Sequence, residues 1–149
     1  MRVLAISGSL RAGSYNSALL RAAGELLPPG GELELWDGLR DVPIYDADLE
    51  AETAPDAVRS LRDAVAAADA VLFATPEYNS SIPGGLKNAL DWASRPPAER
   101  VLTGKVVAVM TSSAKGGGPK VMSYLEEILG LLGNTVVKEP VVALKMGAE

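Results

Sequence analysis

Short apolar runs alternate along the chain with longer segments whose apolar residues recur at helical spacing. Unbroken apolar runs predict strands that are covered on both faces, as in a parallel sheet. These runs are residues 3–6, 70–74 and 106–110. Residues 32–36 alternate polar and apolar positions, which predicts a half-exposed edge strand. Two further apolar pieces, 135–137 and 141–142, predict a last strand that bends at Pro140.

The segments between these strands carry apolar residues three and four positions apart, which predicts helices that each bury one face. The predicted helices are residues 16–27, residues 56–68, a segment that begins near Pro83, and a segment that ends near Leu132. In the third helix the apolar face comprises Leu86, Ala89, Leu90 and Ala93. Residues 37–55 contain a glycine, two prolines and several acidic residues without sustained periodicity, so we expect a long surface connection in which Tyr45 packs.

Five strands that alternate with four helices predict a three-layer α/β domain around a parallel sheet, because parallel neighbours need crossover connections. The pattern leaves both common doubly wound strand orders open. A length of 149 residues suits one domain, residues 1–149. No apolar stretch approaches the ~20 residues of a membrane span, so we expect no membrane partner.

Polar loops follow three of the predicted strands, at the edge where open α/β sheets bind ligands. The first loop offers an anion the hydroxyls of Ser7, Ser9 and Ser14, the charge of Arg11, and the free N–H groups of a helix start. It therefore has the composition of a phosphate cradle. An ordinary turn with Ser14 or Asn16 as the helix N-cap is the alternative that this loop alone leaves open.

Two well-known phosphate-binding loops do not match these residues. Gly8 and Gly13 have the spacing of a Walker A loop, but Ser14 and Tyr15 follow where a lysine and then a serine or threonine are required. The dinucleotide fingerprint needs a second glycine two positions after the first, and Leu10 stands there. The loop must be interpreted together with the rest of the chain.

The composition removes most protein-borne chemistry. The chain has no histidine and no cysteine, which excludes thiolate nucleophiles, disulfides, the usual zinc sites and a Ser-His-Asp triad. We therefore name no catalytic side chain and no metal ligand, and we expect the chemistry to come from a cofactor. A net charge of −5 argues against broad nucleic-acid binding. The N-terminus shows no secretory signal pattern, so we expect a cytoplasmic protein.

Two long motifs and the first loop together resemble the NADPH-dependent FMN reductase family, from residue 1 through the last strand. The motifs are Gly8-Ser9-Leu10-Arg11 with Ser14 and Asn16, then Pro76-Glu77-Tyr78-Asn79, then Pro83-Gly84 with Leu86-Lys87-Asn88-Ala89-Leu90-Asp91-Trp92. The resemblance implies a flavodoxin-like fold with strand order 2-1-3-4-5 and bound FMN. It also implies transfer of electrons from NAD(P)H to a small-molecule acceptor by a ping-pong mechanism, with flavins, quinones, azo dyes or metal oxyanions as acceptors.

The resemblance also implies which residues hold the cofactor. The FMN phosphate would contact Ser9, Arg11, Ser14, Asn16 and Ser17. The isoalloxazine would lie against Pro76, Glu77, Tyr78 and Asn79, with backbone N–H groups of the last three as donors. A third wall would comprise Ser112, Ser113 and Gly116. Tyr78 has the alternative of a mere rim aromatic, and we expect Lys87, Asp91 and Trp92 to brace their helix instead of touching substrate.

The chain departs from the family pattern at its end. Family members continue past the fifth strand into a last helix, whereas residues 143–149 alone remain here. In the 2-1-3-4-5 order this leaves one helix on one face of the sheet and three on the other. We therefore expect a homo-oligomer, a dimer or a tetramer, that uses the uncovered face or exchanges C-terminal segments across it. Two functional alternatives remain beside the reductase. They are a flavin-binding electron carrier or redox-responsive protein without turnover of its own, and a regulatory domain that no longer binds flavin.

Overall fold

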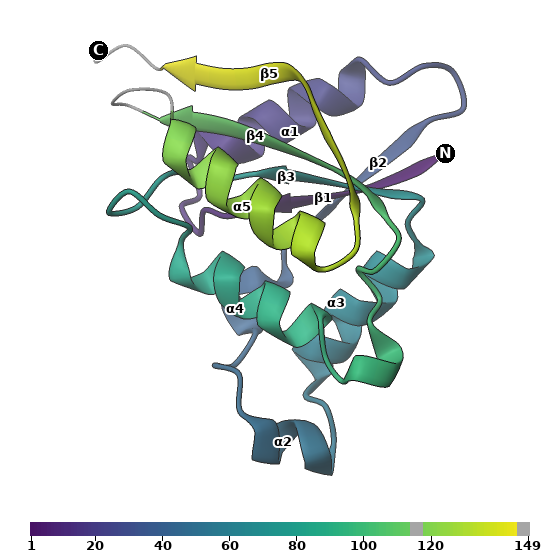
Figure 1. Ribbon diagram of the computed structural model, residues 1–149. Helices are drawn as coiled ribbons and strands as arrows, with labels where there is room; N and C mark the ends of the chain where they lie inside the picture. The colour runs from purple at the N-terminus through teal and green to yellow at the C-terminus, as the bar shows by residue number, and fades with distance from the viewer. Residues whose placement is uncertain (114–117, 146–149) are drawn as a thin grey trace.

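The computed structural model describes residues 1–113 and 118–145, and within these ranges five parallel strands form one sheet (Figure 1). The strands are β1 (Arg2–Ser7), β2 (Glu32–Trp36), β3 (Ala70–Ala74), β4 (Val106–Ser113) and β5 (Thr135–Lys145). Their spatial order is β2-β1-β3-β4-β5, and each neighbouring pair is parallel. This order confirms the flavodoxin-like expectation, and β2 lies at the sheet edge as its alternating pattern predicts.

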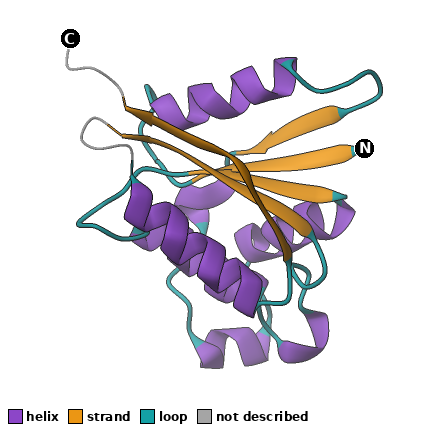
Figure 2. Cartoon of the chain, turned by 45° about the horizontal axis from the view of Figure 1, so that its top comes forward, coloured by secondary structure: helices purple, strands orange, loops and turns teal. Residues whose placement is uncertain are grey.

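Helices cover the two faces of the sheet unequally (Figures 1 and 2). The longer helices are α1 (Tyr15–Glu25), α3 (Asp56–Ala67), α4 (Gly84–Ala93) and α5 (Pro119–Leu131). Among the described residues α1 packs alone on one face, where Leu20 meets Ala5, Ala74 and Met110. The other three helices lie on the opposite face and bury a much larger apolar cluster around Phe73. The uneven cover follows from right-handed crossovers in this strand order.

The strands alternate their side chains between these two clusters. In β1, Leu4 and Ile6 join the large cluster and Ala5 joins the small one. In β4, Val107 and Val109 point to the large cluster, and Met110 points to α1. The apolar runs in the sequence therefore reflect strands with helices on both sides.

Two parts of the chain differ from the sequence-based expectation. β4 continues through Ser113, three residues past the predicted end, because its last residues pair with β5 in the registers Ser112↔Leu144 and Ser113↔Lys145. Ser112 and Ser113 thus lie in a strand and not in a loop. The expected surface connection at 37–55 contains short helices, whose one or two turns are too brief to produce a periodic pattern. These are the 3₁₀ helix η1 (Gly38–Asp41) and α2 (Ala47–Glu52), and a similar 3₁₀ helix, η2 (Pro97–Glu99), precedes β4.

The last strand pairs irregularly in the part where the sequence predicts a bend. Residues 135–137 of β5 pair with β4 in one register and residues 142–145 pair in another, with an irregularity opposite 108–110. Thus the two apolar pieces of the sequence correspond to the two paired parts of the strand.

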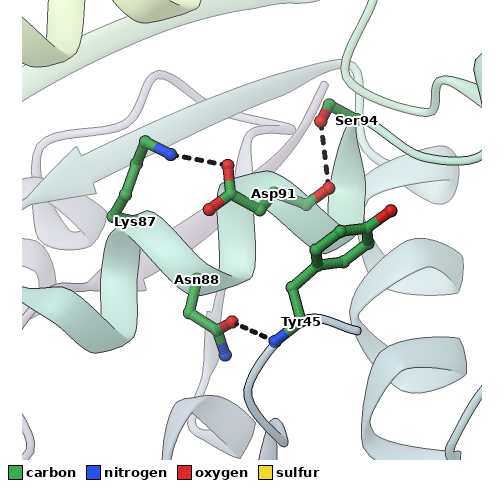
Figure 3. A network of polar contacts seen from close by, with 5 residues as sticks. All are labelled: Tyr45, Lys87, Asn88, Asp91 and Ser94. Atoms are coloured by element: carbon green, nitrogen blue, oxygen red, sulfur yellow. Dashed lines mark hydrogen bonds and ion pairs between the residues drawn. The ribbon is translucent and has the colours of Figure 1, made fainter. Parts of the chain in front are cut away.

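Side chains of α4 hold the 37–55 connection against the body of the protein (Figure 3). The Asn88 amide oxygen accepts from the Tyr45 backbone N–H at 2.8 Å, and its nitrogen donates to the Pro43 carbonyl at 2.8 Å. The Trp92 indole N–H donates to the same carbonyl, and the Tyr45 ring packs edge-on against Trp92 with centroids 5.0 Å apart. The Tyr45 hydroxyl donates to Glu50, which raises the pKa of this tyrosine. Tyr45 is a packing residue, as expected.

The remaining polar residues of α4 also serve the helix. Lys87 and Asp91 form an ion pair of 2.6 Å one turn apart (Figure 3). Both side chains are close to half exposed, and a solvent-screened pair of this kind contributes about 0.3–0.5 kcal/mol. Lys87 and Asp91 therefore brace α4, as the sequence predicts, whereas Trp92 holds the 37–55 connection. No helix in the described ranges is long and apolar enough to span a bilayer.

Candidate functional site

A cavity of about 340 Å³ opens where the carboxyl ends of β1, β3 and β4 meet. The segments that follow β1 and β3, the start of α1 and the end of β4 form its walls. The residues that line it are Ser9, Arg11, Ser14, Tyr15, Asn16, Pro76, Glu77, Tyr78, Ser112 and Ser113. Its volume lies within the range of about 300–1,000 Å³ that is typical of small-molecule sites.

The cavity collects most of the site residues that the sequence predicts, and two of the described ones, Ser17 and Asn79, are not part of its lining. Ser17 lines a smaller neighbouring cavity that shares Ser9 and Arg11 with the first. Asn79 is exposed at a hairpin tip and is absent from the cavity wall as the described residues form it. Gly116 lies outside the described residues. Tyr15 lines the cavity although the sequence did not single it out, because a half-exposed aromatic at a helix start carries no specific signal.

The first loop concentrates hydrogen-bond donors at the start of α1. Ser14 is the N-cap, and its hydroxyl oxygen accepts from the Ser17 backbone N–H at 3.3 Å. This bond leaves the hydroxyl hydrogen of Ser14 for another acceptor. The N–H groups of Tyr15 and Asn16 have no carbonyl partner within the helix, because they belong to its first turn. The N-cap role therefore coexists with a cradle suited to an anion.

Arg11 is held within the same loop. Its guanidinium donates to the Gly13 carbonyl at 3.1 Å, and its backbone N–H donates to the Ser9 hydroxyl at 3.3 Å. The guanidinium carbon lies 6.0 Å from the centre of the Tyr15 ring, the outer limit of a cation–π contact. A guanidinium has five N–H donors, so these contacts orient the group and leave donors for a ligand.

Gly8 lets this loop leave β1 against the end of β3. The Gly8 N–H donates to the Ala74 carbonyl at 2.8 Å. A Cβ at position 8 would lie 2.2 Å from the Thr75 hydroxyl oxygen, closer than atoms can approach. The close approach therefore requires glycine, and it brings the loops after β1 and β3 to one cavity.

A buried amide joins α1 to the end of β4. The Asn16 side chain, 3% exposed, accepts from the Ser112 N–H at 2.8 Å and donates to the Ser112 carbonyl at 3.0 Å. The sequence predicts Asn16 as a phosphate ligand or an N-cap; Ser14 is the N-cap, and the structure gives the Asn16 side chain this positioning role. The Ser112 hydroxyl oxygen is itself buried and has no partner among the described residues, although it lies in a residue that lines the cavity. A buried hydroxyl without a partner is uncommon, and a bound ligand would supply one.

The segment after β3 forms a tight hairpin at the cavity rim. Tyr78 and Ser81 exchange backbone hydrogen bonds of 3.1 and 3.0 Å. Asn79 and Ser80 between them have φ values of 51° and 60°, as a type I′ turn requires. The Tyr78 N–H is thus already used inside the hairpin, which corrects the expectation that it would donate to a ligand. The Tyr78 side chain is half exposed at the rim.

The carboxylate of Glu77 caps α5. It accepts from the backbone N–H groups of Lys120 and Val121, each at 3.1 Å. The N-cap residue, Gly118, has no side chain to do this and adopts a φ of +65°. The sequence analysis predicts a role for the backbone N–H of Glu77 and none for its side chain. The capping contact spans more than forty residues, so no local pattern signals it.

Comparison with known proteins gives consistent relatives over nearly the whole chain. The model of the NADPH-dependent FMN reductase family matches residues 1–149. The chain is 47% identical over 145 residues to an NAD(P)H-dependent FMN reductase of Pseudomonas aeruginosa, covering 97% of this chain and 77% of that protein. It is 40% identical over 142 residues to a quinone reductase of Escherichia coli K12, covering 94% and 75% respectively.

A solved structure agrees with these relatives. The flavoenzyme NAD(P)H:(acceptor) oxidoreductase FerB from Paracoccus denitrificans superposes with a TM-score of 0.91 at 36% sequence identity. The match covers 99% of this chain and 80% of that one. The similarity therefore includes the strand ends and the loops that form the cavity.

Replacing Glu77 by alanine should destabilise the protein by about 1–2 kcal/mol, because two N–H groups at the start of α5 lose their acceptor. Glu77→Gln retains an acceptor oxygen and loses the charge, so it should cost less than the alanine variant. Urea unfolding of both variants measures the difference. Glu127→Ala, on the exposed side of α5, is the control and should change stability by less than about 0.5 kcal/mol. Equal stability of Glu77→Ala and wild type would contradict the capping role.

Proposed function

Because the chain belongs to the NADPH-dependent FMN reductase family, we propose that it binds FMN in the strand-end cavity and uses NAD(P)H to reduce flavins, quinones or similar small acceptors. The observation that carries the proposal is the convergence of three strand ends on one cavity with an N-capped helix start and Arg11 in its wall. The curated relatives named above are reductases of the same kinds of acceptor.

The residues of the cavity fit FMN. A phosphate would meet the Arg11 guanidinium, the hydroxyls of Ser9 and Ser14, and the first-turn N–H groups of α1. The unpartnered hydroxyl of Ser112 offers a further donor in the buried wall. Pro76 and the backbone of Glu77 would border the ring system, and Tyr78 would lie at its open edge. These assignments are parts of the proposal.

When bound, FMN would supply the redox chemistry, which is hydride transfer from the nicotinamide and electron transfer to the acceptor. The protein then needs no acid, base or nucleophile of its own, which agrees with a chain that has no histidine and no cysteine. What these residues contribute is binding and orientation. Arg11 and the α1 start hold the phosphate end, and Asn16 fixes this end relative to the β4 wall. Donor and acceptor would use the open side of the cavity in turn.

Anaerobic mixing of the FMN-loaded protein with NADPH or NADH tests the reductase function. We expect the flavin absorbance to bleach within seconds and to return when a quinone is added. Free FMN at the same concentration is the control, because it reacts with reduced nicotinamides slowly without a protein that orients the two. A loaded protein that does not bleach with either nicotinamide would support an electron carrier instead. A protein that binds no FMN would support the regulatory alternative.

Arg11→Ala should weaken FMN binding about ten- to a hundredfold, because one charge-assisted contact to the phosphate is lost. Binding of riboflavin, which has no phosphate, should change little. Fluorescence titration of both flavins gives the two dissociation constants. Arg100→Ala is the control. Arg100 is an exposed residue that precedes β4, on the side of the sheet where the strands begin, so both dissociation constants should stay unchanged. Equal weakening of FMN and riboflavin by Arg11→Ala would show that Arg11 does not bind the phosphate.

The oligomeric state is a further part of the proposal. On the α1 side, β4 and β5 expose Val106, Val137 and Leu144 to 44%, 44% and 45%. Their side follows from strand alternation, since Val107 and Val136 pack in the cluster on the opposite face and Val142 packs with α1. Apolar side chains that are exposed on one face of a sheet favour an interface. We therefore propose a homo-oligomer in which this face meets a second copy of the chain.

Aspartate at two neighbouring positions of β4 tests this interface. Val106→Asp should dissociate the oligomer and leave the fold intact, because Val106 is exposed in the single chain. Val107→Asp should prevent folding, because its side chain is 1% exposed beneath the three-helix layer. Light scattering and circular dichroism distinguish the two results. A wild-type protein that is monomeric at micromolar concentration would refute the proposal.

A further inference from the structure

A second cavity of about 200 Å³ lies beside the first, on the β2 side of the first loop. The two cavities share Ser9 and Arg11 in their walls, so the loop after β1 separates them. Arg21 of α1 and Arg40 of η1 also line the second cavity. It thus brings together three arginines from three different elements.

These three arginines lack carboxylate partners among the described residues. The ion pairs that the described part of the chain forms involve other residues. Arg11 and Arg40 donate to the carbonyls of Gly13 and Leu10, and Arg40 does so at 2.8 Å. Such carbonyl contacts orient a guanidinium without neutralising it. Asp37 is the one acidic residue in the described lining, so Arg21 and Arg40 leave positive charge in excess even when Arg11 is assigned to the FMN phosphate.

The gathering of arginines contrasts with the rest of the molecule. The chain as a whole carries a net charge of −5. Like charges that line one small cavity repel one another, and a bound anion would offset that repulsion. Ser17 and Arg21 lie one helical turn apart on the same face of α1, so a hydroxyl accompanies the charges. The Ser17 and Ser7 hydroxyls are 2.9 Å apart in this wall.

We propose that the second cavity binds the 2′-phosphate of NADPH and thereby makes the protein prefer NADPH to NADH. This inference rests on the proposed reductase function. An anion held next to the flavin cavity would belong to a molecule that extends across both, and the nicotinamide donor is such a molecule. NADPH differs from NADH by one phosphate that carries nearly two negative charges, and guanidinium groups bind phosphate with paired, charge-assisted hydrogen bonds.

The position of Arg40 agrees with this assignment by analogy. In dinucleotide-binding doubly wound folds, an acidic residue downstream of the glycine-rich loop binds the ribose 2′-hydroxyl of NAD, and a nearby arginine accommodates the 2′-phosphate of NADP. Asp37 follows β2 directly here, and Arg40 lies three residues later in η1. The analogy concerns the chemistry of the residues, because the nucleotide loop itself differs.

Direct binding tests the inference without turnover. Calorimetry on the FMN-loaded protein compares adenosine 2′,5′-bisphosphate with adenosine 5′-monophosphate, which lacks the 2′-phosphate. We expect the bisphosphate to bind at least about tenfold more tightly, the difference that one charge-assisted contact provides. Arg21→Gln and Arg40→Gln should each reduce this preference, and the double variant should abolish it. Arg100→Gln, an exposed arginine whose side chain has no hydrogen bond among the described residues, is the control and should retain the preference.

Steady-state kinetics provide the second measurement. The double variant should raise KM for NADPH about ten- to a hundredfold and leave KM for NADH within about twofold. An unchanged ratio of the two KM values, or a bisphosphate preference that survives both substitutions, would overturn the inference. The inference would also be overturned if the double variant lost affinity for FMN but not for riboflavin. The second cavity would then hold the FMN phosphate. Bisphosphate binding that depends on Arg21 and Arg40, in a protein without turnover, would support the site and refute the reductase function.

Discussion

Two hydrogen bonds between the buried side chain of Asn16 and the backbone of Ser112 connect the start of α1 to the end of β4. These residues are far apart in sequence, and the contact satisfies a buried peptide N–H and carbonyl that a shorter side chain would leave unpaired. The Gly8 N–H makes a similar connection to β3. The walls of the cavity therefore have fixed relative positions before any ligand enters, which lowers the entropic cost of binding.

Glu77 also connects two segments that are distant in the sequence. Its backbone belongs to the cavity wall, and its carboxylate holds the start of α5. The charge of this carboxylate also interacts favourably with the positive end of the α5 helix dipole. One residue thus ties the segment after β3 to the helix after β4, and a change in either would be transmitted to the other through two short contacts.

Local patterns in the sequence predict the parts of this fold that depend on burial. The apolar run at Ala70–Ala74 coincides with β3, and the apolar face of α4 is buried at Leu86 and Leu90 as its spacing indicates. Features that depend on distant pairing could not be predicted in the same way. The extension of β4 through Ser113 needs β5, and α2 is too short to show a period. The use of the Tyr78 N–H within its own hairpin depends on two positive φ values that neither asparagine nor serine guarantees.

The way in which residues 37–55 are attached indicates where the fold tolerates insertions, deletions and proteolytic cuts. Asn88 and Trp92 hold the chain at Pro43 and Tyr45, and Leu49 of α2 packs partly against the core, whereas residues 51–53 beyond it are exposed. A segment fastened at its entry, with its tip in solvent, can be lengthened, shortened or cut by a protease without exposing the core. The exposed residues 51–53 at the end of α2 are therefore the natural position for an insertion, a fluorescent label or a fused domain, away from the strand ends at which the cavity opens (Figure 1).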